Sequence, residues 1–278
     1  MSEKNGKDSG ISVGEGMGKT ELASWEVFAQ YVQRGQTAVV MGPGASIAYD
    51  SSFLTTAHLL GRSGVLLVVD PKSITRSVPL DQKTKGPIRG AGDVDLHLKQ
   101  LTYLNDGGMD VALPSWVGPN ATCASTTLPS ETCEIIIDHN TSPFVTGSDD
   151  KSERLYWLNK TYSEYARILQ PGGVLLLQTS DKRYKFGEGR GKISLVSLLE
   201  ESGFSVLTQK VVDKFKIPIS AQDVKLLRTI PMEAELFDKI THNIIEENPG
   251  EFYFERSARQ SQFVVPHESI NMYVGIRQ

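Results

Sequence analysis

Several features of common protein classes are scarce or absent in this chain of 278 residues. No apolar run approaches the roughly 18 residues that a membrane-spanning helix needs, so we expect no membrane association. The first residues contain no apolar signal core, and the only two cysteines, Cys123 and Cys133, do not have the spacing of metal ligands. These absences predict a cytoplasmic protein with reduced thiols and no metal.

The chain also lacks an excess of positive charge, because its formal net charge is -4. Without a broad positive field we expect no nucleic-acid partner. The 39% of hydrophobic residues suffices for a substantial core, and the length suits one large α/β domain with insertions or two small domains. The oligomeric state stays open, with a homodimer as one alternative.

A motif near the N-terminus, GEGMGKT at Gly14–Thr20, is similar to the phosphate loop of nucleotide triphosphatases. That loop needs a glycine five residues before Gly18, where this chain has Val13. It must also follow a buried strand, whereas the residues before Gly14 are mostly polar. We therefore interpret residues 1–35 as an N-terminal segment that ends in a cap helix.

Residues 36–278 alternate between apolar runs and amphipathic segments, which is typical of a doubly wound α/β domain. Unbroken runs such as GVLLVVD at 64–70 fit strands that are buried on both faces of a parallel sheet. The predicted strands are 37–41, 64–70, 109–117, 133–140, 173–180, 205–212 and 270–278. The predicted helices are 20–35, 46–60, 93–108, 152–169, 192–204 and 232–250.

Two segments lie outside this alternation. Residues 74–92 are polar, basic and rich in glycine and proline, so we expect a long loop. Residues 214–266 form an insertion before the last strand, and we expect it to act as a lid over the acceptor or as an oligomer surface.

The candidate cofactor loop is GPGAS at 42–46, which follows the first predicted strand directly. A Gly-x-Gly turn after a buried strand lets the backbone approach a ligand, and the next helix then offers free N–H groups. Asp70 ends the second strand, where a carboxylate accepts hydrogen bonds from both hydroxyls of a ribose. The Gly-x-Gly turn alone and Asp70 alone each fit an ordinary turn. One helix and one strand separate the two features along the chain, and this spacing favours a nucleoside site.

Segments in this order resemble the class I, Rossmann-like S-adenosylmethionine-dependent methyltransferases. The resemblance covers about residues 37–212 and the terminal strand, and it rests on VVMGPGAS, GVLLVVDP, LPSETCEIIIDHN, YARILQPGGVLLLQTS and LLEESGFSV. It implies a mostly parallel, seven-stranded sheet with an antiparallel last strand and an insertion before it. It also implies S-adenosyl-L-methionine as the cofactor and a small-molecule O, N or C acceptor.

The resemblance assigns roles to individual residues. The implied cofactor-binding residues are Gly42, Pro43, Gly44, Ser46, Asp70, Pro71, Asp110, Asn120, Ala121 and Asp138, with Asn120 and Asp110 as competing contacts to adenine. His139 is the candidate general base, because its pKa lies naturally near neutrality, although a histidine that is merely hydrogen-bonded at a strand end is the competing interpretation. Tyr31, His139 and Asn140 are the candidate acceptor-binding residues.

The chain also departs from the family pattern. Val40 stands where the family has an acidic residue that positions the amino end of the cofactor, and Asp138 is a candidate replacement. A nicotinamide-dependent dehydrogenase is the rival on the same fold, but Ile47 occupies the position of its third glycine. A protein methyltransferase and a non-catalytic scaffold with this fold remain the alternative functions.

Overall fold

A computed structural model of the chain describes residues 22–42, 51–70, 94–118, 120–139, 151–179, 194–212, 216–230, 244–255 and 270–278. Its strands are β1 (Leu22–Ala23), β2 (Thr37–Met41), β3 (Val65–Val69), β4 (Pro114–Trp116), β5 (Cys133–His139), β6 (Leu169–Thr179), β7 (Phe204–Val212), β8 (Lys216–Ile219), β9 (Ile244–Asn248), β10 (Glu251–Glu255) and β11 (Ile270–Arg277). Its helices are α1 (Ser24–Tyr31), α2 (Ser51–Leu60), α3 (Val94–Asp106), α4 (Lys151–Ile168), α5 (Leu195–Glu201) and α6 (Ala221–Arg228).

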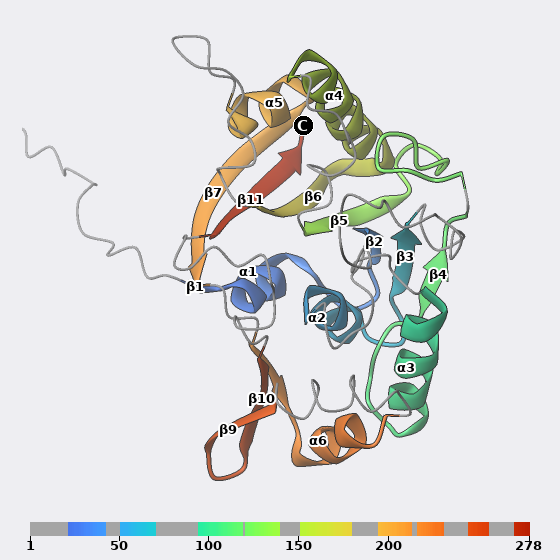
Figure 1. Ribbon diagram of the computed structural model, residues 1–278, viewed down its shortest axis with the longest axis vertical. Helices are drawn as coiled ribbons and strands as arrows, with labels where there is room; N and C mark the ends of the chain where they lie inside the picture. The colour runs from blue at the N-terminus through green and yellow to red at the C-terminus, as the bar shows by residue number, and fades with distance from the viewer. Residues whose placement is uncertain are drawn as a thin grey trace, which may run out of the picture.

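The central sheet has the strand order β1-β7-β11-β6-β5-β2-β3-β4 (Figure 1). Its neighbouring strands pair in parallel except at β11, which pairs antiparallel with both β6 and β7. Seven of these strands are those expected from the sequence, and the two-residue β1 adds an eighth at the edge beside β7. The predicted fold class, a mostly parallel sheet with an antiparallel last strand and an insertion before it, is confirmed.

Helices cover both faces of the sheet, as in Figure 1, where α4 and α5 lie on one side and α1, α2 and α3 on the other. Alternate residues of β2 explain this arrangement, because Ala38 and Val40 belong to the core beneath α1, α2 and α3 while Val39 and Met41 belong to the core beneath α4 and α5. Each fully buried Val or Leu side chain contributes about 1.5–3 kcal/mol to folding. An unbroken apolar strand therefore stabilises both layers.

The predicted helix over 152–169 and the predicted strand over 173–180 leave Pro171 and Gly172 between them as a connection. In the structure β6 begins directly after α4, and Pro171, Gly172 and Gly173 form an irregularity within it. Cys133 pairs with Leu169 and Ile135 pairs with Val174, so β6 holds the extra residues as a bulge.

The crossover from β4 to β5 differs from the usual parallel connection. The described residues 120–132 contain no helix and only an isolated bridge between Thr122 and Ser125. This segment, hereafter the crossover segment, nevertheless contributes Ala121 and Cys123 to the core beneath α4 and α5. It therefore takes the place of a helix on that face of the sheet.

The described part of the insertion contains α6 and a small sheet with the order β8-β10-β9. The predicted helix over 232–250 is wrong for its last residues, because Ile244–Asn248 is a strand that pairs with β10 across a turn at Pro249-Gly250. Helix α6 packs against the C-terminal end of α3, where Leu226 lies against Gly107. Since α3 ends before β4 starts, this contact lies toward the edge of the sheet where the parallel strands begin.

Candidate functional site

The parallel strands at the centre of the sheet end in register, and this carboxyl edge carries the candidate site. Met41 of β2 pairs with Val69 of β3 on one side and with Asp138 of β5 on the other. Gly42 continues β2 with a positive φ of 56° and donates its backbone N–H to Val69 O at 2.9 Å. The chain order of the strands reverses between β2 and β5, which is where doubly wound sheets bind ligands.

Asp70 lies directly after β3 at this edge and is only 3% exposed. Trp116, at the end of the neighbouring β4, donates its indole N–H to Asp70 O at 3.3 Å. Trp116 as a whole residue is 39% exposed, so it is accessible to solvent beside Asp70. A carboxylate at this edge can accept hydrogen bonds from ribose hydroxyls, and an exposed aromatic side chain on the neighbouring strand can stack on a base.

Asp138 is fully buried and faces α4. Tyr165 of α4 donates its hydroxyl to Asp138 Oδ2 at 3.0 Å and also shares a hydrogen bond with Cys123 of the crossover segment. Burial, followed by the charges of Asp138 and Asp70, raises the pKa of the Cys123 thiol to about 12. Burial and the nearby Asp138 likewise raise the pKa of Tyr165. Both groups therefore stay protonated at neutral pH.

The structure brings four of the sequence-predicted residues to the carboxyl edge: Gly42, Asp70, Ala121 and Asp138. Ala121 is buried in one core with Met41 and Val69, and Asn120 precedes it as an exposed residue. Asp138 and Val40 face opposite sides of the sheet, since their side chains lie beneath α4 and beneath α1 and α2 respectively. Asp138 therefore does not occupy the space of a carboxylate at position 40.

Asp110 is not part of this group. It accepts hydrogen bonds from Arg34 and from the backbone N–H of Arg62, two residues that precede β2 and β3. These bonds, led by the one from Arg34, lower the pKa of Asp110 and place it at the edge where the strands begin. A strand of five residues spans about 16 Å, so Asp110 lies too far from Asp70 to share a nucleoside with it.

Tyr31 also lies away from the carboxyl edge. Helix α1 starts beside the carboxyl end of β7, where β1 pairs with Val211 and Val212, and it ends shortly before β2 begins. Tyr31 is its last residue, half-buried against the core beneath α1, α2 and α3. Among the aromatic residues of α1, Trp25 lies at the start of the helix and is therefore nearer to the carboxyl edge than Tyr31 is.

The remaining candidates lie at the limits of what the structure describes. Pro43, Gly44, Ser46, Pro71 and Asn140 lie outside the described residues, as does the predicted loop 74–92. The backbone of His139 lies at the end of β5 and pairs with Gln178. The side chain of His139 is not among the described parts of the structure. Its role as a base stays a prediction.

Sequence reasoning missed Trp116, and it assigned the aromatic residues of the helix that contains Tyr165 chiefly to core packing, with one or two of them reaching a pocket. Tyr165 is indeed buried in the core, but its hydroxyl also reaches Asp138. The strand order of the predicted fold could have identified Trp116. Trp116 ends the strand next to β3, and Asp70 directly follows β3, so the two residues are expected to lie close together.

A hollow lies at the opposite edge, with a volume of about 380 Å³ among Arg34, Arg62, Ser63, Gly108 and Asp110. Both guanidinium groups are already engaged, Arg34 by Asp110 and Arg62 by Asn105. Within the described ranges, no group of three metal-ligating side chains occurs, and no helix has the length and apolar character of a membrane span.

No family model matches the chain, and comparison with curated proteins gives no match. Among solved structures, the YcgJ protein of Bacillus subtilis is 14% identical, with 92% of this chain and 98% of that chain covered and a TM-score of 0.44. A SAM-dependent methyltransferase of Aquifex aeolicus is 17% identical, with coverages of 68% and 85% and a TM-score of 0.40. The arsenic(III) S-adenosylmethionine methyltransferase of Chlamydomonas reinhardtii is 12% identical, with coverages of 89% and 65% and a TM-score of 0.42. At these values the likenesses carry no inference about activity.

Proposed function

We propose that this chain is a methyltransferase that uses S-adenosyl-L-methionine and methylates a small-molecule acceptor in the cytoplasm. The observation that carries the proposal is the buried Asp70 at the end of β3, beside the positive-φ Gly42 that follows β2. Gly42 follows the strand that borders the switch point between β2 and β5, and Asp70 follows the next strand of the same sheet, β3. The small-molecule acceptor and the cytoplasmic location rest on the sequence reasoning above.

The residues present fit the cofactor. Asp70 is the candidate to hold the ribose hydroxyls, and Trp116 beside it is the candidate to stack on adenine. Ala121 lines the same edge, and the turn that begins at Gly42 lets the backbone approach the methionine end.

The cofactor would supply a methyl group that its positive sulfur already activates. The chain then has to align the acceptor with the carbon–sulfur bond and exclude water, which requires no catalytic triad or metal. His139, whose backbone ends β5 next to Asp138, is the candidate to take a proton from the acceptor. Asp138 itself is held by Tyr165 inside the protein, which favours a positioning role over direct proton transfer.

Calorimetry with S-adenosylmethionine and S-adenosylhomocysteine tests the proposal. We expect Asp70→Asn to weaken binding by roughly 10- to 100-fold, because hydrogen bonds to a charged partner contribute about 1.5–3 kcal/mol. Asp106→Asn, at an exposed position on α3, is the matched control and should bind like the unchanged protein. Equal affinity of a folded Asp70→Asn protein and the unchanged protein would refute the site.

The apolar residue Val40 supports a non-catalytic function as the second candidate. Val40 is buried in the core beneath α1 and α2, so the face that usually carries an acidic residue is apolar here. A transfer assay with tritium-labelled methyl groups over metabolite pools and over cell protein separates the alternatives. Binding without transfer to any fraction would favour the scaffold, and label in protein alone would favour a protein methyltransferase.

A further inference from the structure

The crossover segment lacks a helix and has few hydrogen bonds of its own, so the structure must hold it in another way. Thr122 and Ser125 exchange two backbone hydrogen bonds, of 2.9 and 3.0 Å, and Ala121 donates to Gly118 O at 3.3 Å. From Thr126 to Glu131 it bonds mainly to side chains and backbone of α4.

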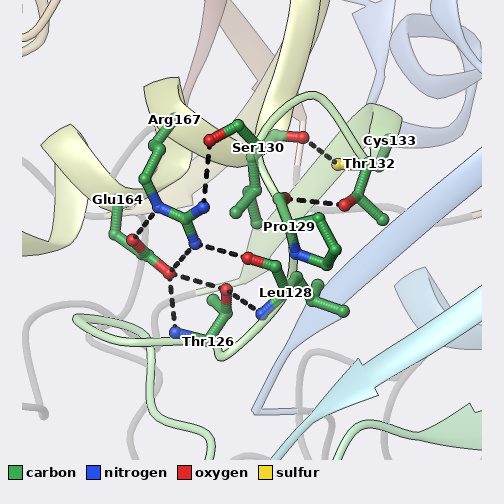
Figure 2. A network of polar contacts seen from close by, with 9 residues as sticks. Thr126, Leu128, Pro129, Ser130, Thr132, Cys133, Glu164 and Arg167 are labelled. Carbon is green, nitrogen blue, oxygen red and sulfur yellow. Dashed lines mark hydrogen bonds and ion pairs between the residues drawn. The ribbon is translucent and has the colours of Figure 1, made fainter.

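Two residues of α4 provide these bonds, as Figure 2 shows. Glu164 Oε1 accepts both the backbone N–H and the hydroxyl of Thr126, each at 2.7 Å. Arg167 donates from Nη2 to Leu128 O at 2.7 Å and from Nη1 to Ser130 Oγ at 3.3 Å. Arg167 also binds both carboxylate oxygens of Glu164 at 2.8 Å, so the two side chains hold each other in place.

The two members of this pair differ in exposure, because the side chain of Arg167 is 39% exposed whereas that of Glu164 lies largely inside the protein. The side chain of Glu164 is only 12% exposed, and Thr126 is fully buried. Burial alone would raise the pKa of Glu164, but the hydrogen bonds from Arg167 and Thr126 outweigh it and lower that pKa. The bond with Glu164 in turn raises the pKa of Arg167. Glu164 is therefore ionised at neutral pH and binds Thr126 as a charged acceptor.

The backbone that this pair holds is strained. Thr127 has a φ of 64° and Glu131 a φ of 57°, values that a β-branched residue such as Thr127 rarely adopts. Both neighbours of Thr127 are fixed, because Thr126 is bound by Glu164 and Leu128 O by Arg167. Glu131 donates its N–H to Arg167 O at 3.0 Å. A strained conformation persists only where its surroundings determine it in this way.

We propose that Glu164 and Arg167 are positioning residues for the nucleoside end of the site, an inference that rests on the proposed function. By holding Thr126–Glu131 in this conformation, they anchor the part of the crossover segment that directly follows Ala121 and Cys123. Ala121 packs with Met41 and Val69, and Cys123 meets Tyr165 near Asp138 and Asp70. Loss of the pair frees this segment and opens the side of the site that faces α4.

The chain offers a direct probe, because Cys123 and Cys133 are its two cysteines and both are buried. In a Cys133→Ala protein, the rate at which a disulfide reagent labels Cys123 under native conditions reports how often the segment opens. We expect Arg167→Met to raise this rate by about tenfold or more, the scale set by hydrogen bonds to charged partners. Glu164→Gln, which keeps an acceptor for Thr126, gives a smaller increase and is available if Arg167→Met fails to fold.

The same variants are measured for binding of S-adenosylhomocysteine and of adenosine. Arg167→Met should weaken both by a similar factor, about tenfold, since the crossover segment flanks the nucleoside and not the methionine end. Thr126→Ser keeps both donors to Glu164, so its labelling rate and its affinities should equal those of the Cys133→Ala protein. Thr126→Val loses the hydroxyl donor, so it should be labelled faster and bind both nucleosides more weakly. Arg34→Met removes an ion pair at the opposite edge of the sheet and should change neither readout.

Unchanged labelling of Cys123 in a folded Arg167→Met protein overturns the inference, and so does faster labelling with unaltered affinity for both nucleosides. If the Cys133→Ala protein itself binds neither nucleoside, the proposed function fails and the nucleoside role of the pair fails with it. The labelling rates then still decide whether Arg167 holds the crossover segment.

Discussion

The hydroxyl of Tyr165 donates a 3.0 Å hydrogen bond to Asp138 in a region where neither side chain meets solvent. Tyr165 belongs to α4 and Asp138 to β5, so this bond joins the helical layer to the carboxyl end of the central strand. Asp138 pairs with Met41, the last residue before the Gly42 turn. The bond therefore helps to determine where the candidate site begins.

Removing this hydroxyl should destabilise the protein. We expect Tyr165→Phe to lower the free energy of unfolding by about 1–3 kcal/mol, because a buried acidic group loses one of its donors. Tyr156→Phe on the same helix is the control, since Tyr156 is 59% exposed and should change stability by less than about 0.5 kcal/mol. Urea unfolding of the two variants makes the comparison, and equal midpoints would show that the Tyr165 hydroxyl contributes nothing.

Adjacent glycines in the bulge of β6 should respond differently to alanine. A Cβ at Gly173 would lie 2.8 Å from Gln170 O and 3.0 Å from Glu134 O, and these backbone atoms cannot move aside easily. A Cβ at Gly172 meets nothing within 4 Å, but its φ of 77° is unfavourable for alanine. We expect Gly173→Ala to cost about 3 kcal/mol and Gly172→Ala about 1–2 kcal/mol in thermal unfolding. The reverse order would mean that the bulge is not packed as described.

His58 should make stability depend on pH. Burial lowers the pKa of His58, although Asp223 and a hydrogen bond to the Asp110 backbone oppose this effect, while Arg34 adds to it. The Nδ1 atom is buried and, among the described residues, has no hydrogen-bond partner. The folded state thus binds a proton less readily than the unfolded state, so stability is complete above the unfolded pKa of about 6.5 and falls as pH decreases below it.

The measurement is urea unfolding at pH 7.5 and pH 5.5 for the unchanged protein and for His58→Gln. Removing the titrating group should reduce the loss of stability between these pH values, by no more than about 1.4 kcal/mol per pH unit for one proton. Identical losses in both proteins would assign the pH dependence to other groups.

Trp116 should report occupancy of the nucleoside site. Under the proposed function, S-adenosylhomocysteine should quench its fluorescence, and the signal should disappear in Trp116→Phe. Trp116→Ala should bind the nucleoside about 10-fold more weakly, because a stacked base contributes about 1–3 kcal/mol. Trp157→Phe on α4 is the control that should leave the quench intact. A quench that survives in Trp116→Phe would place the nucleoside elsewhere.

Much of the sheet could be predicted because its strands are buried on both faces. Runs such as Val65–Val69 and Cys133–His139 carry that signal in their own composition. Asp70 could be predicted for the same reason, because it directly follows one of these apolar runs. The register of β2 and β5, in which Asp138 pairs with Met41, could not be predicted. It depends on contacts between residues that are distant in the sequence, and local sequence patterns do not encode such contacts.

The errors have physical causes. Ile244 and Ile245 fit a helix or a strand, and the Pro249-Gly250 pair that was taken as a helix stop is a hairpin turn with Gly250 at a φ of 85°. Asp110 was a candidate for the acidic residue that contacts adenine in the family, but it precedes β4, which begins only at Pro114, so Asp110 lies at the edge where the strands begin. Helix α6 was missed although Ser220 and Asp223 form a capping box, which is a readable local signal.

Strand β11 has a consequence for how a nascent chain folds. It lies between β6 and β7, yet it follows the insertion in sequence, so ribosomes make residues 213–269 after β7 and before β11. At roughly 5–20 residues per second this delay lasts about 3–11 s. During that time the facing edges of β6 and β7 lack their partner, and unpaired strand edges promote aggregation. The central pairing of this half of the sheet is therefore completed only when β11, the last strand in the sequence, is made.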